Sequence, residues 1–115
     1  MQTILIAEDE PLIRLSTRMV LEEANYTVFE AADGAEAVEV FFDHLGQIDL
    51  VLLDIQMPLL NGYDVLEKMR FVESDVKVLF LTAVVIDWEN YDVEGIIQKP
   101  HDGRELLRKV REVLG

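Results

Sequence analysis

The sequence predicts an α/β fold built on a parallel sheet. Short apolar runs alternate with amphipathic segments from end to end. One run, Asp49–Leu53, is apolar after its first residue, which is typical of a parallel strand buried on both faces. Parallel strands need crossover connections, and the amphipathic segments can supply them as helices. The 115 residues contain no linker or repeat, so we expect a single domain spanning 1–115.

The first half of the chain predicts three strands and two helices. The strands are expected at Thr3–Ala7, Tyr26–Glu30 and Asp49–Leu53. The first helix, Leu12–Ala24, is predicted by apolar residues at helical spacing, which are Leu12, Leu15, Met19 and Val20. The second helix is predicted by a capping box, Asp33 followed by Glu36, and it should end near His44 before Gly46.

The second half predicts two more strands and two helices, with one irregular stretch. A helix should run from about Gly62 to Arg70, and strands should occupy Val76–Leu81 and Ile96–Gln98. A second capping box, Asp102 followed by Glu105, opens a final helix. Residues 83–95 show no clean helical period. We therefore expect a fourth helix there to be one or two turns, shifted or absent.

Composition excludes several classes of function. The net charge is −13, and residues 1–98 hold 20 acids against 5 bases, so direct nucleic-acid binding is not expected, because phosphate contacts need a basic face. No cysteine is present, which rules out disulfides and thiolate metal sites. No signal peptide and no apolar run of about 20 residues is found. We expect a cytoplasmic protein with no membrane partner.

Chemistry-bearing residues stand where the predicted strands end. These are Glu8-Asp9-Glu10, Asp54, Thr82 and Lys99-Pro100. Ligands of such sheets bind outside the carboxyl ends of the strands. Two acids about 4 Å apart repel by about 4 kcal/mol at an effective dielectric near 20, so converging acids favour a hard cation. Mg²⁺ suits carboxylates and phosphate, and Asp54 is the natural nucleophile for an aspartyl phosphate.

Four segments resemble the receiver domains of two-component response regulators. They are Ile4–Glu10, Asp49–Pro58 with Asn61-Gly62, Leu81–Ala83 and Gln98–Pro100. The resemblance covers essentially the whole chain. It implies a flavodoxin-like, doubly wound five-stranded parallel sheet of strand order 2-1-3-4-5. It also implies a sensor histidine kinase or phosphotransfer protein as the phosphoryl donor, and an output domain or downstream protein as the target. A homodimer that forms on phosphorylation is left open.

The resemblance implies a metal site around the phosphoacceptor. Asp54 would accept the phosphoryl group, and Asp9 and Asp54 would bind Mg²⁺ directly. Glu8 would act largely through water, and the backbone carbonyl of Gln56 would be a further ligand.

The resemblance also implies contacts to the phosphoryl group itself. Thr82 would hydrogen-bond the phosphoryl group and move with it, and the backbone of Ala83 would contact that group. Lys99 would contact its oxygens, with a cis peptide bond to Pro100. The protein would then be a self-phosphorylating and self-dephosphorylating switch rather than a turnover enzyme.

The switch region departs from the family pattern. Receivers commonly carry Tyr or Phe three residues before the lysine of the fifth strand, where this chain has Ile96. The interval from Thr82 to Lys99 is also shorter than usual. Two bulky residues lie in it, Trp88 and Tyr91. They either cover the local core, or one of them replaces the missing switch ring.

Three other functions are weighed against phosphoryl acceptance. A pseudo-receiver would keep the fold and act only as an interaction module. A haloacid-dehalogenase-type phosphatase would need a second acid two residues after Asp54, where Gln56 stands. A flavin carrier would need a Ser/Thr/Gly-rich phosphate loop after the first strand, and Glu8-Asp9-Glu10 would repel a phosphate without a cation.

Overall fold

The structure, a computed structural model, describes residues 1–99 and 102–115. Five parallel strands form one sheet in the order β2-β1-β3-β4-β5. The strands are β1 (Thr3–Ala7), β2 (Thr27–Ala31), β3 (Leu50–Asp54), β4 (Lys77–Thr82) and β5 (Gly95–Gln98). The helices are α1 (Pro11–Glu23), α2 (Gly34–Asp43), α3 (Gly62–Val72) and α4 (Gly103–Leu114), with a 3₁₀ turn η1 (Trp88–Asn90). The predicted flavodoxin-like fold and strand order are confirmed.

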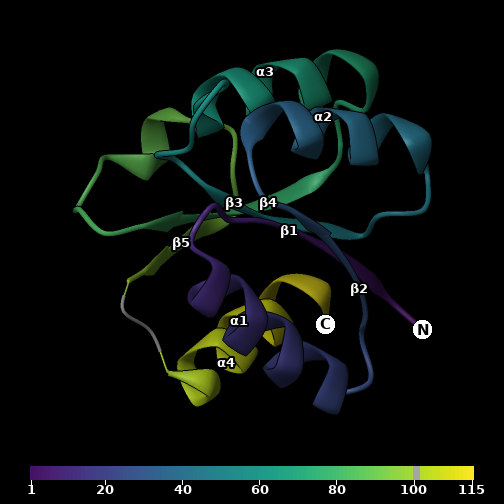
Figure 1. The fold of residues 1–115 in the computed structure, drawn as a ribbon, viewed down its shortest axis with the longest axis vertical. Helices are drawn as coiled ribbons and strands as arrows, with labels where there is room; N and C mark the ends of the chain where they lie inside the picture. The colour runs from purple at the N-terminus through teal and green to yellow at the C-terminus, as the bar shows by residue number, and fades with distance from the viewer. Residues whose placement is uncertain (100–101) are drawn as a thin grey trace.

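Helices cover both faces of the sheet. Helices α2 and α3 lie on one face, and α1 and α4 lie on the other (Figure 1). All five residues of β3 are buried, because its alternate side chains enter two separate cores. Val51 and Leu53 join the core under α2 and α3, whereas Leu50 and Leu52 join the core under α1 and α4. This double burial explains the continuous apolar run in the sequence.

Side-chain caps begin three of the helices. The Asp33 carboxylate accepts a hydrogen bond from the Glu36 backbone N–H at 2.7 Å, and Asp102 accepts one from Glu105 at 2.8 Å. Both predicted capping aspartates are therefore confirmed. Asn61 caps α3 in the same way, accepting from Asp64 at 3.0 Å. Each such cap stabilises its helix by about 1 kcal/mol.

Helix α1 is confirmed, but three of the four residues whose spacing predicted it are exposed, and the fourth, Val20, is only partly buried against the core. Leu12, Leu15 and Met19 are 73%, 50% and 60% exposed. The buried residues are Thr17 and Leu21, which belong to a neighbouring stripe of the same period. An amphipathic period predicts that a helix forms. Which face of the helix packs on the sheet depends on the residues that it meets there.

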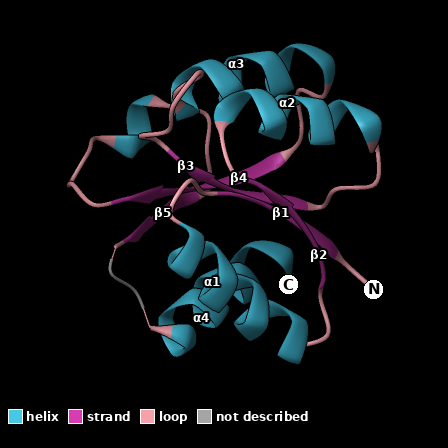
Figure 2. Cartoon of the chain, in the orientation of Figure 1, coloured by secondary structure: helices cyan, strands magenta, loops and turns pink. Residues whose placement is uncertain are grey.

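The connection between β4 and β5 contains only the single turn η1 in place of a regular helix (Figure 2). The expectation of a shortened or atypical fourth helix is confirmed. The expected cis peptide bond between Lys99 and Pro100 lies outside the described residues. Among the described helices, none is long and apolar enough to cross a membrane.

Candidate functional site

The predicted site residues meet at the carboxyl edge of the sheet. Asp54 and Thr82 are the last residues of β3 and β4, Glu8 and Asp9 follow β1, and Lys99 follows β5. One carboxylate oxygen from each of Glu8, Asp9 and Asp54 lies within 4.8 Å of the others. Parallel pairing of β1 with β3 and of β3 with β4 brings these strand ends side by side.

Lys99 sits between two of the three acids. Its Nζ donates a hydrogen bond to Asp54 Oδ2 at 3.0 Å. The same Nζ lies 2.6 Å from Glu8 Oε1, as a close ion pair rather than a well-directed hydrogen bond. The side chains of Glu8, Asp54 and Lys99 are 0%, 4% and 13% exposed. Two buried acids therefore contact one lysine, and the exposed Asp9 adds a third carboxylate beside them, which leaves an excess of negative charge.

Burial dominates the electrostatics of Asp54. It raises the pKa of the Asp54 carboxyl, and the neighbouring Glu8 raises it further. Lys99 and the Gln56 backbone N–H, which donates to Oδ1 at 3.0 Å, act in the opposite direction without cancelling the rise. For Lys99 itself, burial lowers the pKa, but its contacts to Glu8 and Asp54 outweigh burial and raise it. The ammonium therefore stays charged at neutral pH.

Thr82 is buried, and its hydroxyl is engaged in a local turn. Oγ1 accepts a hydrogen bond from the Val84 N–H at 3.1 Å and donates one to the Val84 carbonyl at 2.8 Å. Thr82 and Ala83 line a shallow recess together with Asp9, Asp54, Gln56 and Lys99. All of the predicted site residues except Glu8 therefore line this recess, and the buried Glu8 contacts one of the lining residues, Lys99.

The loop from β3 to α3 folds back over Asp54 because a glycine permits it. A Cβ on Gly62 would lie 2.6 Å from the carbonyl oxygen of Asp54. Gly62 N–H donates to the carbonyl of Ile55 at 2.8 Å, which closes the loop. Inside this loop Leu59 has a positive φ of 71°, a conformation that is uncommon outside glycine. A glycine is therefore required eight residues after Asp54, because any side chain there would collide with the Asp54 backbone.

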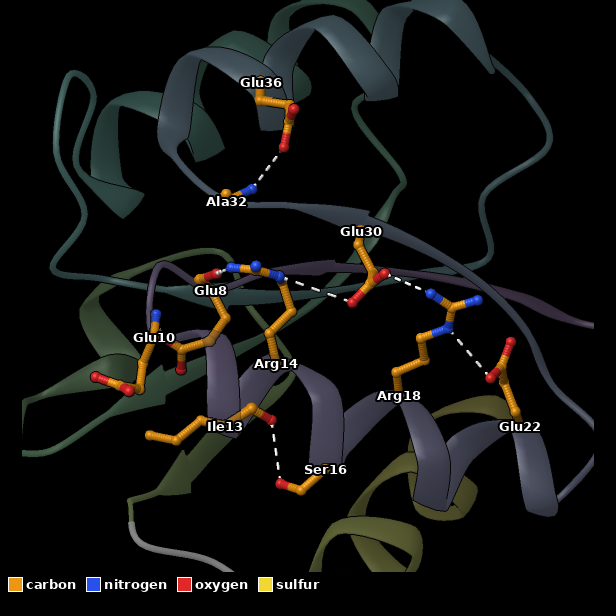
Figure 3. A network of polar contacts seen from close by, with 10 residues as sticks. All are labelled: Glu8, Glu10, Ile13, Arg14, Ser16, Arg18, Glu22, Glu30, Ala32 and Glu36. Atoms are coloured by element: carbon orange, nitrogen blue, oxygen red, sulfur yellow. Dashed lines mark hydrogen bonds and ion pairs between the residues drawn. The ribbon is translucent and has the colours of Figure 1, made fainter.

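Arg14 is a residue beside the site that sequence reasoning missed. Its guanidinium Nη1 donates to the backbone carbonyl of Glu8 at 2.8 Å, and its Nε lies 3.7 Å from Glu30 Oε1 (Figure 3). Arg18 pairs with the same Glu30 at 2.7 Å. A positive charge in the first turn of a helix opposes the helix dipole. That unusual placement in Pro11–Glu23 was the signal available in the sequence.

An aromatic cluster lies beside the recess. The rings of Tyr63 and Tyr91 stack with centroids 4.7 Å apart, and both meet Phe80 edge-on. Tyr63 lines a second recess together with Thr82 and Val84. The family's usual ring position, Ile96, is partly buried against the same core. Trp88 is also partly buried there, so both bulky residues of 83–95 contribute to local packing.

The family model named "Response regulator receiver domain" matches residues 4–111. Among curated proteins, the chain is 32% identical to the sensor kinase CckA of Brucella abortus, covering 97% of this chain and 12% of CckA. It is 37% identical to the probable transcriptional regulator ycf27 of Cyanidium caldarium, covering 96% of this chain and 45% of that regulator. The chain thus spans less than half the length of both relatives.

A solved structure agrees with the fold over the whole chain. The response regulator TrrA of Thermotoga maritima, solved in complex with Mg²⁺-BeF, is 35% identical and superposes with a TM-score of 0.88. The match covers 99% of this chain and 100% of TrrA.

Proposed function

The chain belongs to the response regulator receiver domain family of two-component systems, and we propose that it accepts a phosphoryl group on Asp54 from a sensor histidine kinase or phosphotransfer protein. The observation that carries the proposal is the position of Asp54. It is a buried carboxylate at a strand end, 3.0 Å from an ammonium and beside two further acids. Similarity to the sensor kinase CckA and to the response regulator TrrA, which was solved with Mg²⁺-BeF, supports phosphoryl acceptance by this chain.

The residues present fit a magnesium ion. The oxygens of Glu8, Asp9 and Asp54 are close enough to share one cation, and Lys99 alone does not balance their charge. Asp9 and Asp54 would hold the ion directly, Glu8 largely through water, and Gln56 through its backbone carbonyl. When bound, Mg²⁺ neutralises charge on the oxygens of the transferring phosphoryl group.

The chemical step uses the Asp54 carboxylate as the nucleophile. One of its oxygens forms a bond to phosphorus while the bond from phosphorus to the donor's imidazole nitrogen breaks. That nitrogen keeps the bonding electron pair and takes up a proton. The Lys99 ammonium and the backbone N–H of Ala83 would contact the phosphoryl oxygens, and both residues line the recess that contains Asp54. They stabilise charge by position alone, since they form no covalent bond.

Thr82 links the modification to a change of shape. Its hydroxyl must give up the hydrogen bond that it donates to the Val84 carbonyl before it can donate one to a phosphoryl oxygen on Asp54. Release of Val84 frees the start of the segment 83–87, which leads to the aromatic cluster. The protein then acts as a switch on an output domain or downstream partner rather than as a turnover enzyme.

Labelling by a small phosphodonor tests the proposal. Acetyl phosphate with Mg²⁺ should add one phosphoryl group by intact mass, and chelation of the metal should prevent it. Asp54→Asn should abolish the addition, whereas Asp75→Asn, at an exposed turn, should retain it. If neither acetyl phosphate nor a phosphorylated phosphotransfer domain labels the protein, the chain is a pseudo-receiver acting only as an interaction module.

A further inference from the structure

An exposed apolar surface lies between α2 and α3, away from the phosphoryl site. These helices run side by side on one face of the sheet (Figure 2). We call this surface the α2–α3 groove. Its apolar lining residues are Ala35, Val38, Phe42, Leu60, Phe71 and Val72.

The groove presents aromatic and aliphatic side chains to solvent. Phe71 is 92% exposed, Phe42 42% and Val72 43%. Clustered apolar residues of this kind mark interaction surfaces, whereas isolated ones do not. A small-molecule site would enclose most of its ligand, but the Phe71 ring stands almost entirely in water. The groove therefore suits a macromolecular partner that covers Phe71 from outside.

The charged residues around the groove indicate which charge a partner should carry. Helices α2 and α3 carry five acids and two bases. One of the two bases, Arg70, is turned away and donates to the backbone carbonyls of Ser74, Val76 and Asp92. Lys68 and Glu67 line the groove, and Glu39 lies on the same side of α2, four residues after Ala35. Two acids, Glu39 and Glu67, thus stand against one base, Lys68, so the rim carries a small excess of negative charge.

A second copy of this chain fits that rim poorly. The chain has a net charge of −13, so two copies repel each other at moderate salt. Helix α4 is the most basic element, but its apolar residues Leu106 and Val110 are already buried in its own core. A separate cationic partner satisfies both the apolar floor and the acidic rim.

We propose that the α2–α3 groove docks an amphipathic, basic helix of a partner protein. The apolar side of that helix would rest on Phe42, Leu60 and Phe71. Its Lys or Arg flanks would face Glu39 and Glu67. Helix α2 has 10 residues, so the groove is roughly 15 Å long, which matches anchors at positions i, i+4 and i+7 of a docked helix. Docking does not require phosphorylation of Asp54.

A pair of designed peptides tests this proposal. Both are 18-residue helices with leucine anchors at i, i+4 and i+7; one has lysines and the other glutamates at the flanking positions. Fluorescence anisotropy measures their binding, and ¹H–¹⁵N NMR maps the contact. The lysine peptide should bind at least tenfold more tightly than the glutamate peptide and should shift the resonances of Val38, Phe42 and Phe71.

Variants locate the binding. Phe71→Ser should weaken the lysine peptide at least tenfold with little loss of fold, because the ring is already exposed. Leu12→Ser, which removes an exposed leucine from α1 on the other face, should leave binding unchanged. The double change Glu39→Lys and Glu67→Lys should reverse the preference between the peptides. Asp54→Asn should bind like the native chain, so failure of phosphoryl acceptance and failure of docking are separable.

Three results would overturn the proposal. Equal affinity for the two peptides would remove the charge argument, and binding unaffected by Phe71→Ser would place the contact elsewhere. Sedimentation that reveals a concentration-dependent dimer abolished by Phe71→Ser would assign the groove to a second copy of the chain.

Discussion

Lys99 Nζ contacts Asp54 Oδ2 at 3.0 Å and Glu8 Oε1 at 2.6 Å. A single ammonium thus lies against two buried carboxylates that would otherwise repel each other, Glu8 just after β1 and Asp54 at the end of β3. Asp9 adds a third carboxylate beside them. The carboxylates consequently repel one another when no metal ion is bound. The stability of the protein should therefore respond to pH, to Mg²⁺ and to loss of Lys99.

Removing the charge of Asp54 should stabilise the metal-free protein at neutral pH. The folded-state pKa of Asp54 is raised above the ordinary value of 3.8. The contribution of protonated Asp54 to the free energy of unfolding is therefore complete below pH 3.8 and is lost as the pH rises through the folded-state pKa. Asn cannot ionise, so Asp54→Asn should be more stable than the native chain at pH 7, and the difference should vanish below about pH 3.8. Urea unfolding in EDTA across this range measures the effect.

The exposed acid Asp75 provides the control for that series. Asp75→Asn should change stability by less than about 0.5 kcal/mol at any of these pH values. A destabilised Asp54→Asn at pH 7, or a gain that persists at pH 3, would contradict the electrostatic account.

Magnesium should stabilise the native chain through the acid cluster. A ligand that binds only the folded state adds about 2.7 kcal/mol at 100 times its Kd. Thermal unfolding should therefore shift upward with Mg²⁺ and saturate. Asp9→Asn should lose this upward shift, because the substitution replaces a charged carboxylate ligand by a neutral amide. Potassium chloride at matched ionic strength is the control, and an equal shift with that salt would indicate general screening rather than a site.

Loss of Lys99 should destabilise the fold. Lys99→Met leaves Glu8 and Asp54 buried without their cation, and breaking such a pair costs about 3 kcal/mol or more. The pKa of Lys99 is raised above 10.5, so its contribution is complete below that pH and disappears only as pH rises through the folded-state pKa. Lys68→Met, on the exposed side of α3, should be nearly neutral. Equal stabilities of the two variants at pH 7 would contradict the prediction.

Phosphoryl mimicry at Asp54 should alter the surroundings of Trp88 or Tyr91. Thr82 must give up the hydrogen bond that it donates to the Val84 carbonyl to reach the mimic, and the segment beyond Val84 leads to the stacked Tyr63–Tyr91 pair. Beryllium fluoride with Mg²⁺ should change Trp88 fluorescence or the ring resonances of Tyr91. Thr82→Ala should reduce the change while leaving mimic binding measurable. If neither residue responds, neither has replaced the missing switch ring at Ile96.

Arg70 should hold the segment before β5 in place. Its guanidinium is largely buried and donates to the backbone carbonyls of Val76 and Asp92, which ties α3 to the chain after η1. Arg70→Met should cost about 2 kcal/mol, since the part-buried Val76 carbonyl and the Asp92 carbonyl lose a charged donor. Hydrogen exchange should accelerate most in residues 88–94. Uniform acceleration across the sheet would instead indicate a general loss of stability.

Much of the fold and the site followed from local pattern. Alternating strands and helices implied the parallel sheet, and the continuous apolar run of β3 implied burial on both faces. The carboxyl ends of parallel strands share one edge, so Glu8, Asp9, Asp54, Thr82 and Lys99 could be placed together without coordinates. Resemblance to receiver domains then supplied the strand order and the expected roles.

The sequence by itself therefore determined which elements form and which residues gather at the strand ends, because hydrophobic period and strand polarity are local properties. Only the tertiary structure decided which stripe of α1 is buried, where the Thr82 hydroxyl points, and that Tyr91 stacks on Tyr63. These outcomes depend on competition among several packing partners distant in sequence. The contacts of Arg70 with backbone carbonyls could not be predicted either, since a carbonyl acceptor leaves no signature in the residue type.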